Sequence, residues 1–188
     1  MDSLKQKILD DGKVIGSNIL KVDSFINHQI DTKMLDEIGS YIAAKFDGVT
    51  KIVTIETSGI AFACSVARHY NFAPVVFAKK AKSEILKDDV YETKVYSFTK
   101  KQTFNVYIDK RFLNKDDKIL IVDDFLADGN ACFGLIDLCN QAEANIIGIG
   151  IVVEKGFQPG HSRFEEAGYK VESCATVLKL ENGCVTLK

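Results

Sequence analysis

The fold is decided by the stretch KILIVDDFLADGNACFGLIDL, residues 118 to 138. It starts with a continuous apolar run, which is typical of a strand buried on both faces. Two adjacent carboxylates, Asp123 and Asp124, follow the run, and a turn of small residues comes next. From Gly129 to Ala142 the apolar residues recur at helical spacing. A buried strand that leads through a glycine turn into a helix indicates an α/β protein.

The same pattern recurs on both sides of this stretch. KIVTIE (51–56) is a β-branched run, TSGIAFACSVARHY (57–70) turns into a helix, and PVVFAKK (74–80) is the next strand. NIIGIGIVVEK (145–155) predicts the last long core strand. Parallel strands joined through helices require right-handed crossovers. We therefore predict the α/β class, with an open and mainly parallel sheet and helices on both faces.

The remaining segments are shorter. Helices are predicted from Ser3 to Asp11, from Asp31 to Phe46 and from Ser162 to Ala167. Residues 84–108 alternate between apolar and polar, which predicts an antiparallel ribbon attached to the sheet. Strands over YKVESCATVLKL and CVTL complete the chain, which we expect to form one domain over residues 1–188.

Composition excludes several classes of protein. With 188 residues, 46% hydrophobic, the chain has enough apolar material for one core. A formal charge of -2 without a block of like charges argues against nucleic-acid binding. The start, MDSLKQKILDDG, does not resemble a secretory signal, and no apolar run has membrane-spanning length, so we expect a cytoplasmic protein without a membrane partner. The five cysteines form no C-x-x-C pair, and we expect buried free thiols.

The carboxylate pair has a chemical interpretation. In open α/β sheets, ligands bind beyond the carboxyl ends of the strands, where helix N-termini present free N–H groups. We expect Asp123 and Asp124 to lie at this rim, where the strand begins to turn. Carboxylates accept from hydroxyls and a small-residue loop binds a phosphate, so together they fit a sugar phosphate. The alternative is a solvated turn that only caps the following helix.

Within these residues, ILIVDDFLADGNA resembles the phosphoribosyl-pyrophosphate (PRPP) motif of the type I phosphoribosyltransferases. Five further stretches resemble those of the bacterial xanthine phosphoribosyltransferases in the same order, so the resemblance covers essentially the whole chain: LKVDSFINHQID, KIVTIETSGIA, PVVFAKK, VYSFTKKQT and GIGIVVEKGFQPG. The resemblance implies the type I phosphoribosyltransferase fold. Its small hood would come from residues of about 1–30 and 155–188, and its lid ribbon from about 83–107.

The resemblance also implies a reaction. The family transfers a phosphoribosyl group from PRPP to N9 of xanthine in purine salvage, giving xanthosine 5′-monophosphate (XMP) and pyrophosphate. It works as a homodimer with Mg²⁺, which is bound through PRPP and pyrophosphate and not by a dedicated protein site. Asp123 and Asp124 would be the catalytic carboxylates that hold the ribose hydroxyls. The 5′-phosphate would bind to the loop Ala127, Asp128, Gly129, Asn130 and Ala131.

One residue of this loop departs from the family pattern. Many members carry Thr-Gly-x-Thr here and the xanthine enzymes more often Ala-Asn-Gly, whereas this chain reads Ala-Asp-Gly. Because a carboxylate would repel a phosphate, we expect the Asp128 side chain to point away or to cap the following helix.

The second loop at the same edge would receive pyrophosphate. It contains Thr57, Ser58 and Gly59, and either Lys79 or Lys80 from the next strand would neutralise charge there. Without the resemblance, these residues indicate only an N-capped helix and a solvated strand end. A non-proline cis peptide bond in the loop is a further hypothesis, although under about 0.1% of such bonds are cis.

The purine would contact Leu20, Asn27 and Lys155, with Phe157 nearby. Xanthine carries two carbonyl oxygens and loses a proton near neutral pH, so an ammonium at its 2-oxo edge would select it. Lys155 is therefore the predicted specificity residue, and His28 is not expected to be catalytic.

The ribbon is predicted to close over the reaction as a lid, with contacts from Tyr96, Ser97 and Lys100. A permanently ordered hairpin that supports a dimer contact is the alternative.

Three other functions compete with this interpretation. A hypoxanthine and guanine (or adenine) transferase would share the fold, although Asn27 and Lys155 argue against adenine. A non-catalytic PRPP-binding regulator would need a DNA-binding domain, for which the segment before Lys21 is too short. A phosphatase would need an Asp-x-Asp pair, which the adjacent aspartates do not provide.

Overall fold

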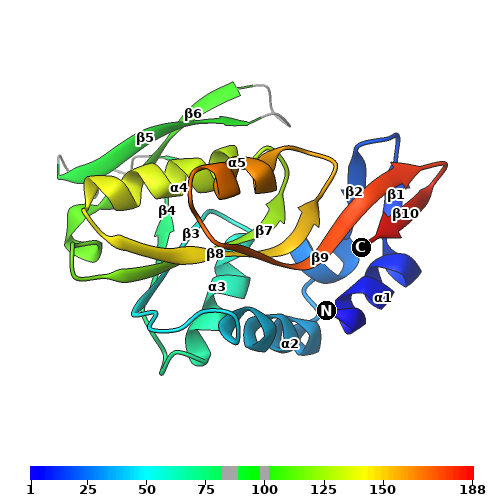
Figure 1. Cartoon of the computed structure of the whole chain (residues 1–188), viewed down its shortest axis with the longest axis horizontal. Helices are drawn as coiled ribbons and strands as arrows, with labels where there is room; N and C mark the ends of the chain where they lie inside the picture. Colours follow the sequence, from blue (N-terminus) through cyan, green and yellow to red (C-terminus); the bar gives the residue numbers. More distant parts are fainter. Residues whose placement is uncertain (82–88, 98–101) are drawn as a thin grey trace.

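The structure is a computed structural model that describes residues 1–81, 89–97 and 102–188. A six-stranded sheet runs through it in the order β10-β9-β8-β7-β3-β4 (Figure 1). Only β10 is antiparallel to its neighbour, so the predicted mainly parallel α/β architecture is confirmed. The strands are β3 (Lys51–Ile55), β4 (Val75–Ala78), β7 (Lys118–Leu126), β8 (Asn145–Lys155), β9 (Val171–Glu181) and β10 (Cys184–Leu187).

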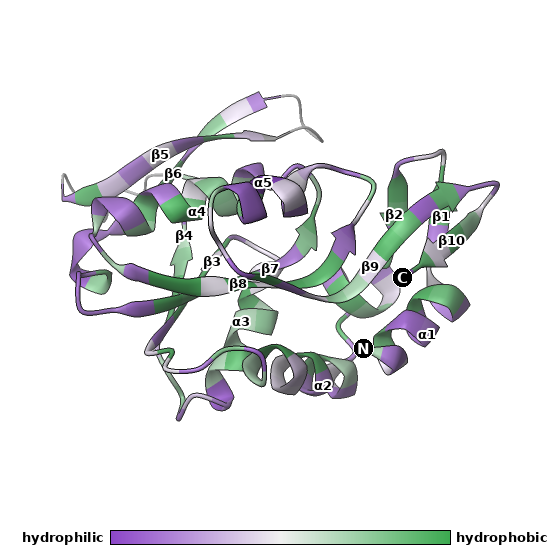
Figure 2. Ribbon diagram, in the orientation of Figure 1, coloured by the Kyte–Doolittle hydropathy of each residue, from purple (hydrophilic) through white to green (hydrophobic). Residues whose placement is uncertain are grey.

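Helices cover both faces of the sheet, as predicted. One face carries α2 (Thr32–Ala43) and α3 (Gly59–Arg68), and the other carries α4 (Asn130–Gln141) and α5 (Gly160–Glu166) (Figure 1). Strand β7 shows why its sequence is a continuous apolar run: Leu120 and Val122 belong to the core on the α2 and α3 side, whereas Ile119 and Ile121 belong to the core on the α4 side. The hydrophobic residues accordingly follow the central strands and the inner helix faces (Figure 2).

The N- and C-terminal segments lie together at one end of the sheet (Figure 1). This end contains α1 (Asp2–Asp11), a short pair of strands β1 (Lys13–Ile15) and β2 (Ile19–Lys21), and β10. A single π-helical turn, η1 (Asp23–Asn27), follows β2. The Met1 ammonium donates to the carbonyl of Cys174 at 2.6 Å and so ties the chain start to β9.

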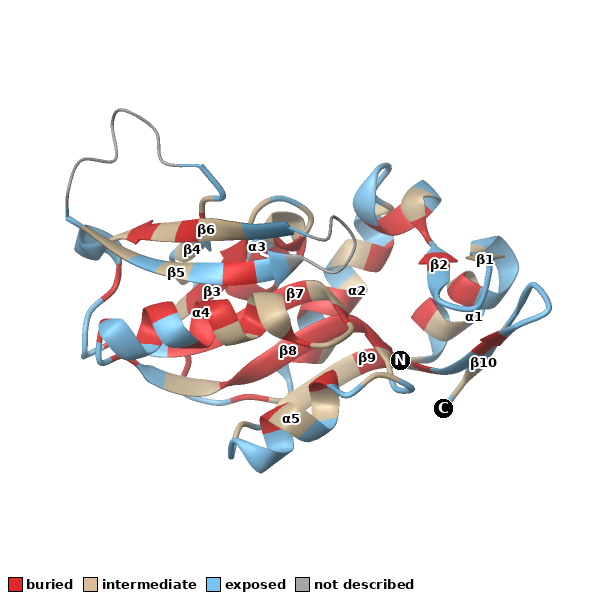
Figure 3. Ribbon diagram, turned by 90° about the horizontal axis from the view of Figure 1, so that it is seen from above, coloured by how far each residue is buried: buried red, intermediate tan, exposed pale blue. Residues whose placement is uncertain are grey.

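The predicted ribbon is formed by β5 (Val90–Ser97) and β6 (Gln102–Asp109), which pair from Val90↔Asp109 to Ser97↔Gln102. It is a two-stranded sheet of its own, joined to the main sheet by a bridge between Lys79 and Tyr107 and followed by the 3₁₀ turn η2 (Lys110–Phe112). The ribbon packs on α4 (Figure 3). Gly134 on α4 leaves room there for the Val95 side chain.

The cysteines are all free, but the prediction that all are buried is wrong for two of them. Cys132, Cys139 and Cys174 are buried, whereas Cys64 lies on the outer side of α3 and Cys184 on the edge strand β10. Apolar neighbours in sequence did not reveal which side of each element faces solvent. In the described part of the chain, no helix has the length and apolarity to cross a membrane.

Candidate active site

The carboxylate pair lies where two neighbouring strands separate. β7 pairs with β3 only from Lys51↔Ile119 to Val53↔Ile121, although β3 continues to Ile55. After β3 the chain continues to one edge of the sheet, and after β7 to the other, so this is the topological switch point at which open α/β sheets bind ligands. Asp123 and Asp124 therefore open onto the crevice between β7 and β3.

The expectation that the strand turns at the pair is wrong. β7 continues to Leu126 because β8 still pairs with it, at Phe125↔Val153 and Leu126↔Glu154. Local bonds fix the carboxylates instead: the Asp124 N–H donates to Asp123 Oδ1 at 3.0 Å, and the Phe125 N–H donates to Asp124 Oδ1 at 2.9 Å.

The pair is not a solvated turn. Asp123 is only 6% exposed, and its pKa is raised well above the ordinary value by burial and by the charge of Asp124. Burial also raises the pKa of Asp124, whereas hydrogen bonds from the Phe125 backbone and from the side chains of Ser58 and Asn27 lower it. A buried carboxyl group next to a half-buried one forms a site that a ligand with hydroxyl donors would relieve.

The loop after β3 approaches the pair closely. A Cβ on Gly59 would lie 2.2 Å from Thr54 Oγ1 and 3.2 Å from Asp123 Oδ1, so only glycine fits. The peptide bond between Glu56 and Thr57 is cis, in agreement with the sequence hypothesis. Glu56 was not predicted: its carboxylate accepts from the Lys80 N–H at 2.9 Å and joins the loop to the end of β4.

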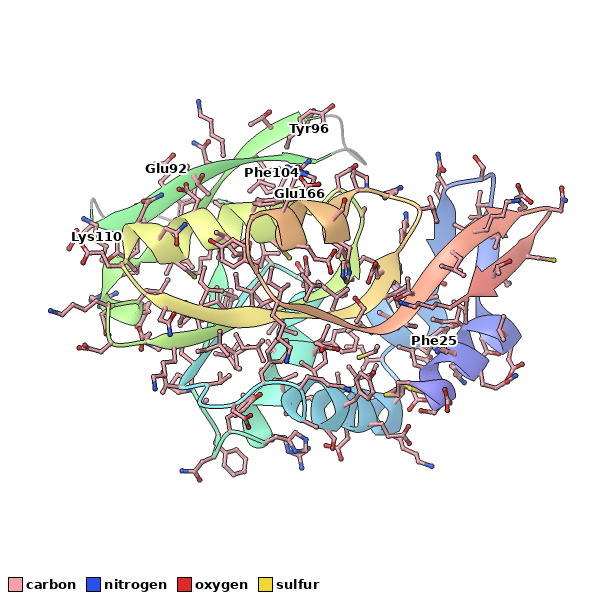
Figure 4. The ribbon with its side chains drawn as sticks, viewed as in Figure 1. Phe25, Glu92, Tyr96, Phe104, Lys110 and Glu166 are labelled. Atoms are coloured by element: carbon pink, nitrogen blue, oxygen red, sulfur yellow. The ribbon has the colours of Figure 1, made fainter. Side chains whose placement is uncertain are left out.

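The loop after β3, the carboxylates of β7, the start of α4, Lys80 after β4 and the ribbon line one cavity of about 220 Å³. The cavity is lined by Ile55, Glu56, Thr57, Ser58, Gly59, Lys80, Val95, Tyr96, Phe104, Asp123, Asp124 and Ala131. Of the two candidate lysines, Lys80 lines it, with its Nζ 5.5 Å from the centroid of Phe104, whereas Lys79 lines a different hollow along β4. Tyr96 and Phe104 come from the two strands of the ribbon (Figure 4).

The loop after β7 forms a second cavity of about 130 Å³ beside the first. Its lining includes Tyr96, Phe125 and the whole segment from Ala127 to Cys132, and it shares Tyr96, Asp123 and Ala131 with the first cavity. Gly129 has φ of 82° and is the residue from which α4 starts, so the backbone turns here into the first free N–H groups of a helix.

Of the two alternatives expected for Asp128, capping of α4 is wrong: the N-cap residue is Gly129, and no side chain caps the helix there. The charge of Asp128 acts on Lys155 instead. Burial lowers the pKa of Lys155, and Asp128 opposes that shift.

The predicted purine contacts come from three elements, β2, η1 and β8. Asn27, on η1, is exposed and hydrogen-bonds to Asp124. Lys155 ends β8 and donates to the carbonyl of Asn18 at 2.8 Å. Leu20 is 6% exposed and packs in the hydrophobic core, and Phe157 is 38% exposed beyond Lys155. Of the ribbon residues, Tyr96 lines both cavities, Ser97 ends β5, and Lys100 lies outside the described residues.

Comparison with known proteins identifies the family. The model of the phosphoribosyl transferase domain matches residues 27–177. The chain belongs to the phosphoribosyltransferase family. A xanthine phosphoribosyltransferase of Clostridioides difficile is 53% identical over 190 residues and covers both chains completely. One of Staphylococcus aureus is 53% identical and covers 100% of this chain and 98% of its own. The resemblance to xanthine phosphoribosyltransferases is therefore confirmed.

Solved structures of this phosphoribosyltransferase family confirm the fold. The Giardia lamblia adenine enzyme, complexed with 9-deazaadenine, aligns with a TM-score of 0.74 over 92% of this chain and 97% of its own, at 22% identity. The Saccharomyces cerevisiae adenine enzyme aligns with a TM-score of 0.73 over 93% and 99%, at 21% identity. The type I fold of this phosphoribosyltransferase is thus shown, with the crevice between β3 and β7 at its centre.

Some residues of this candidate site were not predicted from the sequence. Thr54 is fully buried under Gly59 and its hydroxyl has no partner among the described residues. Arg163 reaches the loop after β7 from α5, far along the chain. Glu56 had a usable signal, because it directly follows a buried strand at the ligand-binding edge, whereas nothing local to Arg163 indicated its contact.

Proposed function

We propose that this protein transfers the phosphoribosyl group of PRPP to N9 of xanthine, forming XMP and pyrophosphate in purine salvage. The observation that carries the proposal is the identity of 50–53% over the full chain to proteins named xanthine phosphoribosyltransferase. The layout of the crevice supports it, because two cavities that share Asp123 suit a ligand with phosphate groups at both ends.

The two cavities suggest a division of roles along PRPP. The loop from Ala127 to Ala131 would bind the 5′-phosphate through backbone N–H groups at the start of α4. Asp123 and Asp124 would accept hydrogen bonds from the ribose hydroxyls between the cavities. Pyrophosphate would lie against Thr57, Ser58 and Gly59, with Lys80 as the cation of that cavity. Lys79 would have no direct role.

Mg²⁺ fits this arrangement as a companion of PRPP. Among the described residues, no group of three or more His, Cys, Asp or Glu side chains could hold a metal. Mg²⁺ is commonly bound by one or two carboxylates together with substrate phosphates, and Asp123 and Asp124 are the carboxylates next to the proposed pyrophosphate cavity. When bound, the ion would neutralise charge on the departing pyrophosphate.

Catalysis would come mainly from holding the reactants in line. The anomeric carbon becomes cation-like as pyrophosphate leaves, so no protein nucleophile is needed. The carboxylates of Asp123 and Asp124 would stabilise the developing positive charge and fix the ribose. Tyr96 and Phe104 on the ribbon would exclude water that would otherwise hydrolyse PRPP. In this proposal the ribbon is the lid and the terminal segments form the hood.

Base selection is assigned to Lys155. Its ammonium has three donors, and one of them is bound to the carbonyl of Asn18, which leaves two for the 2-oxo edge of xanthine. Asn27 would orient the base and couple it to Asp124. Leu20, in the hood core, would supply the apolar wall.

The test is an assay of purified protein with PRPP and Mg²⁺ on xanthine, guanine, hypoxanthine and adenine, followed by pyrophosphate release. Xanthine is expected to react fastest. Preference for guanine or hypoxanthine would show that the protein is instead a hypoxanthine and guanine transferase. Binding of PRPP without turnover of any base would favour a non-catalytic regulator. The homodimer and the cytoplasmic location stay predictions; sedimentation of the purified protein tests the first.

A further inference from the structure

Arg163 connects α5 to the phosphate loop. Its guanidinium Nη1 donates to the backbone carbonyl of Asp128 and to Asn130 Oδ1, the latter at 3.1 Å. The guanidinium also lies over the ring of Phe133, 4.5 Å from its centroid. Two hydrogen bonds and a stacked ring hold this long side chain in one conformation, which a flexible lysine would not reproduce.

These bonds determine which way the loop's N–H groups point. The Gly160 N–H donates to the carbonyl of Ala127 at 3.0 Å, and Arg163 binds the carbonyl of Asp128. In a trans peptide the C=O and the following N–H point in opposite directions. With both carbonyls turned to α5, the N–H groups of Asp128 and Gly129 face the other side of the loop. That side is the cavity of about 130 Å³, whose lining includes no residue of α5.

The composition of the loop makes this orientation important. Ala127, Asp128, Gly129, Asn130 and Ala131 contain no hydroxyl group, so backbone N–H groups are the main donors for a phosphate. Arg163 also fixes the amide of Asn130, because Oδ1 accepts from it while Nδ2 donates to the Tyr96 carbonyl on the ribbon at 3.4 Å.

We propose that Arg163 is a positioning residue for the 5′-phosphate of the sugar donor: it does not touch the phosphate but holds the loop so that its N–H groups converge on it. This inference rests on the proposed function and adds a residue that no resemblance assigned. A purely structural role, pinning α5 to the sheet, is the competing explanation.

The test compares Arg163→Met with Arg163→Lys, and uses Arg68→Met as a matched control. Arg68 is an exposed arginine on α3, paired with Asp36 at 3.0 Å on the opposite face of the sheet. Competitive inhibition against PRPP is measured with ribose 5-phosphate and, separately, with pyrophosphate. Thermal unfolding is recorded for every variant.

In Arg163→Met, the inhibition constant of ribose 5-phosphate is expected to rise at least about tenfold, as for the loss of a charge-assisted hydrogen bond. The inhibition constant of pyrophosphate should stay within roughly twofold of the wild-type value, because the loop proposed to bind pyrophosphate follows β3 and not β7. Added guanidinium at millimolar concentration should restore part of the lost ribose 5-phosphate binding. Arg163→Lys should fall in between and Arg68→Met should match the wild type.

If the wild type is active and the inhibition constants of Arg163→Met are unchanged, the inference is overturned. An equal rise of both inhibition constants in Arg163→Met would overturn it as well. If Arg163→Met does not fold, Arg163→Lys must show the selective loss, and its absence is equally decisive. A wild-type protein that converts no purine would instead refute the proposed function.

Discussion

Replacement of Gly129 by alanine should damage both stability and donor binding, for two separable reasons. Gly129 has φ of 82°, in the left-handed region, where an L-residue costs about 1–2 kcal/mol. A Cβ here would also lie 2.7 Å and 2.9 Å from two atoms of the Phe164 ring. Phe164 is fully buried and stacked on Phe133 with a centroid distance of 4.4 Å, so it has little room to move.

The size of the effect follows from the two contributions. Overpacking of a filled core costs about 1–3 kcal/mol, so Gly129→Ala should lower the free energy of unfolding by about 2–5 kcal/mol in total. Gly168→Ala is the matched control, because Gly168 has φ of 81° and an added Cβ would meet no atom within 4 Å. It should lose only the backbone contribution of about 1–2 kcal/mol.

Urea unfolding and thermal unfolding of the two variants and the wild type measure this difference in stability. At about 2–4 °C per kcal/mol, the melting temperature of Gly129→Ala should lie several degrees below that of Gly168→Ala. The KM for PRPP should rise only in Gly129→Ala, since the displaced ring lies directly under the phosphate loop. Equal losses of stability in the two variants would refute the argument from Phe164, and an unchanged KM would refute the role of the loop.

Four further variants test the remaining assignments. The folded-state pKa of Asp123 is raised above its unfolded value, so its contribution to stability is full at low pH and is lost as the pH rises through the folded pKa. At pH 7, Asp123→Asn should therefore unfold at a higher urea concentration than the wild type, and it should lose this advantage in acid. Its activity should be at least about tenfold lower. A lower stability than the wild type at pH 7 would contradict the raised pKa of Asp123. Lys80→Met should weaken pyrophosphate inhibition about tenfold and Lys79→Met should not, judged from inhibition constants, and the reverse order would exclude Lys80 as the cation. Lys155→Met should raise the KM for xanthine about tenfold with little change for PRPP in steady-state kinetics; equal effects on both would remove its role in base selection.

The central sheet could be predicted because each buried strand carries its own signal. The apolar runs of β3, β7 and β8 are local patterns, and glycine turns mark where helices follow. The end of β7 could not be predicted in this way, since pairing with β8 extends it past the carboxylates while β3 no longer pairs there. The course of a strand depends on its neighbours as well as on its own residues.

In the candidate site, too, some residues could be predicted from local sequence and others required the structure. Asp123, Asp124 and Gly129 stand out within one short stretch, and the resemblance added Asn27, whose bond to Asp124 is non-local. The choice between Lys79 and Lys80 required the structure, because both follow β4, and the bridge of Lys79 to Tyr107 and the bend at Lys80 decide which cavity each lines. The contact of Arg163 with the loop spans 35 positions and depends on how α5 packs, so no sequence pattern predicts it.

The burial of the carboxylate pair is itself an argument for function. A turn that served only to cap a helix would keep its carboxylates in solvent, yet Asp123 is 6% exposed and does not cap α4. Burying one carboxylate beside a second, half-buried one costs stability, and asparagine at either position would avoid that cost. Local rules are broken mainly at functional sites. The same stretch that decides the fold therefore carries the destabilising feature that a ribose with two hydroxyl donors, lying between the two cavities, would relieve.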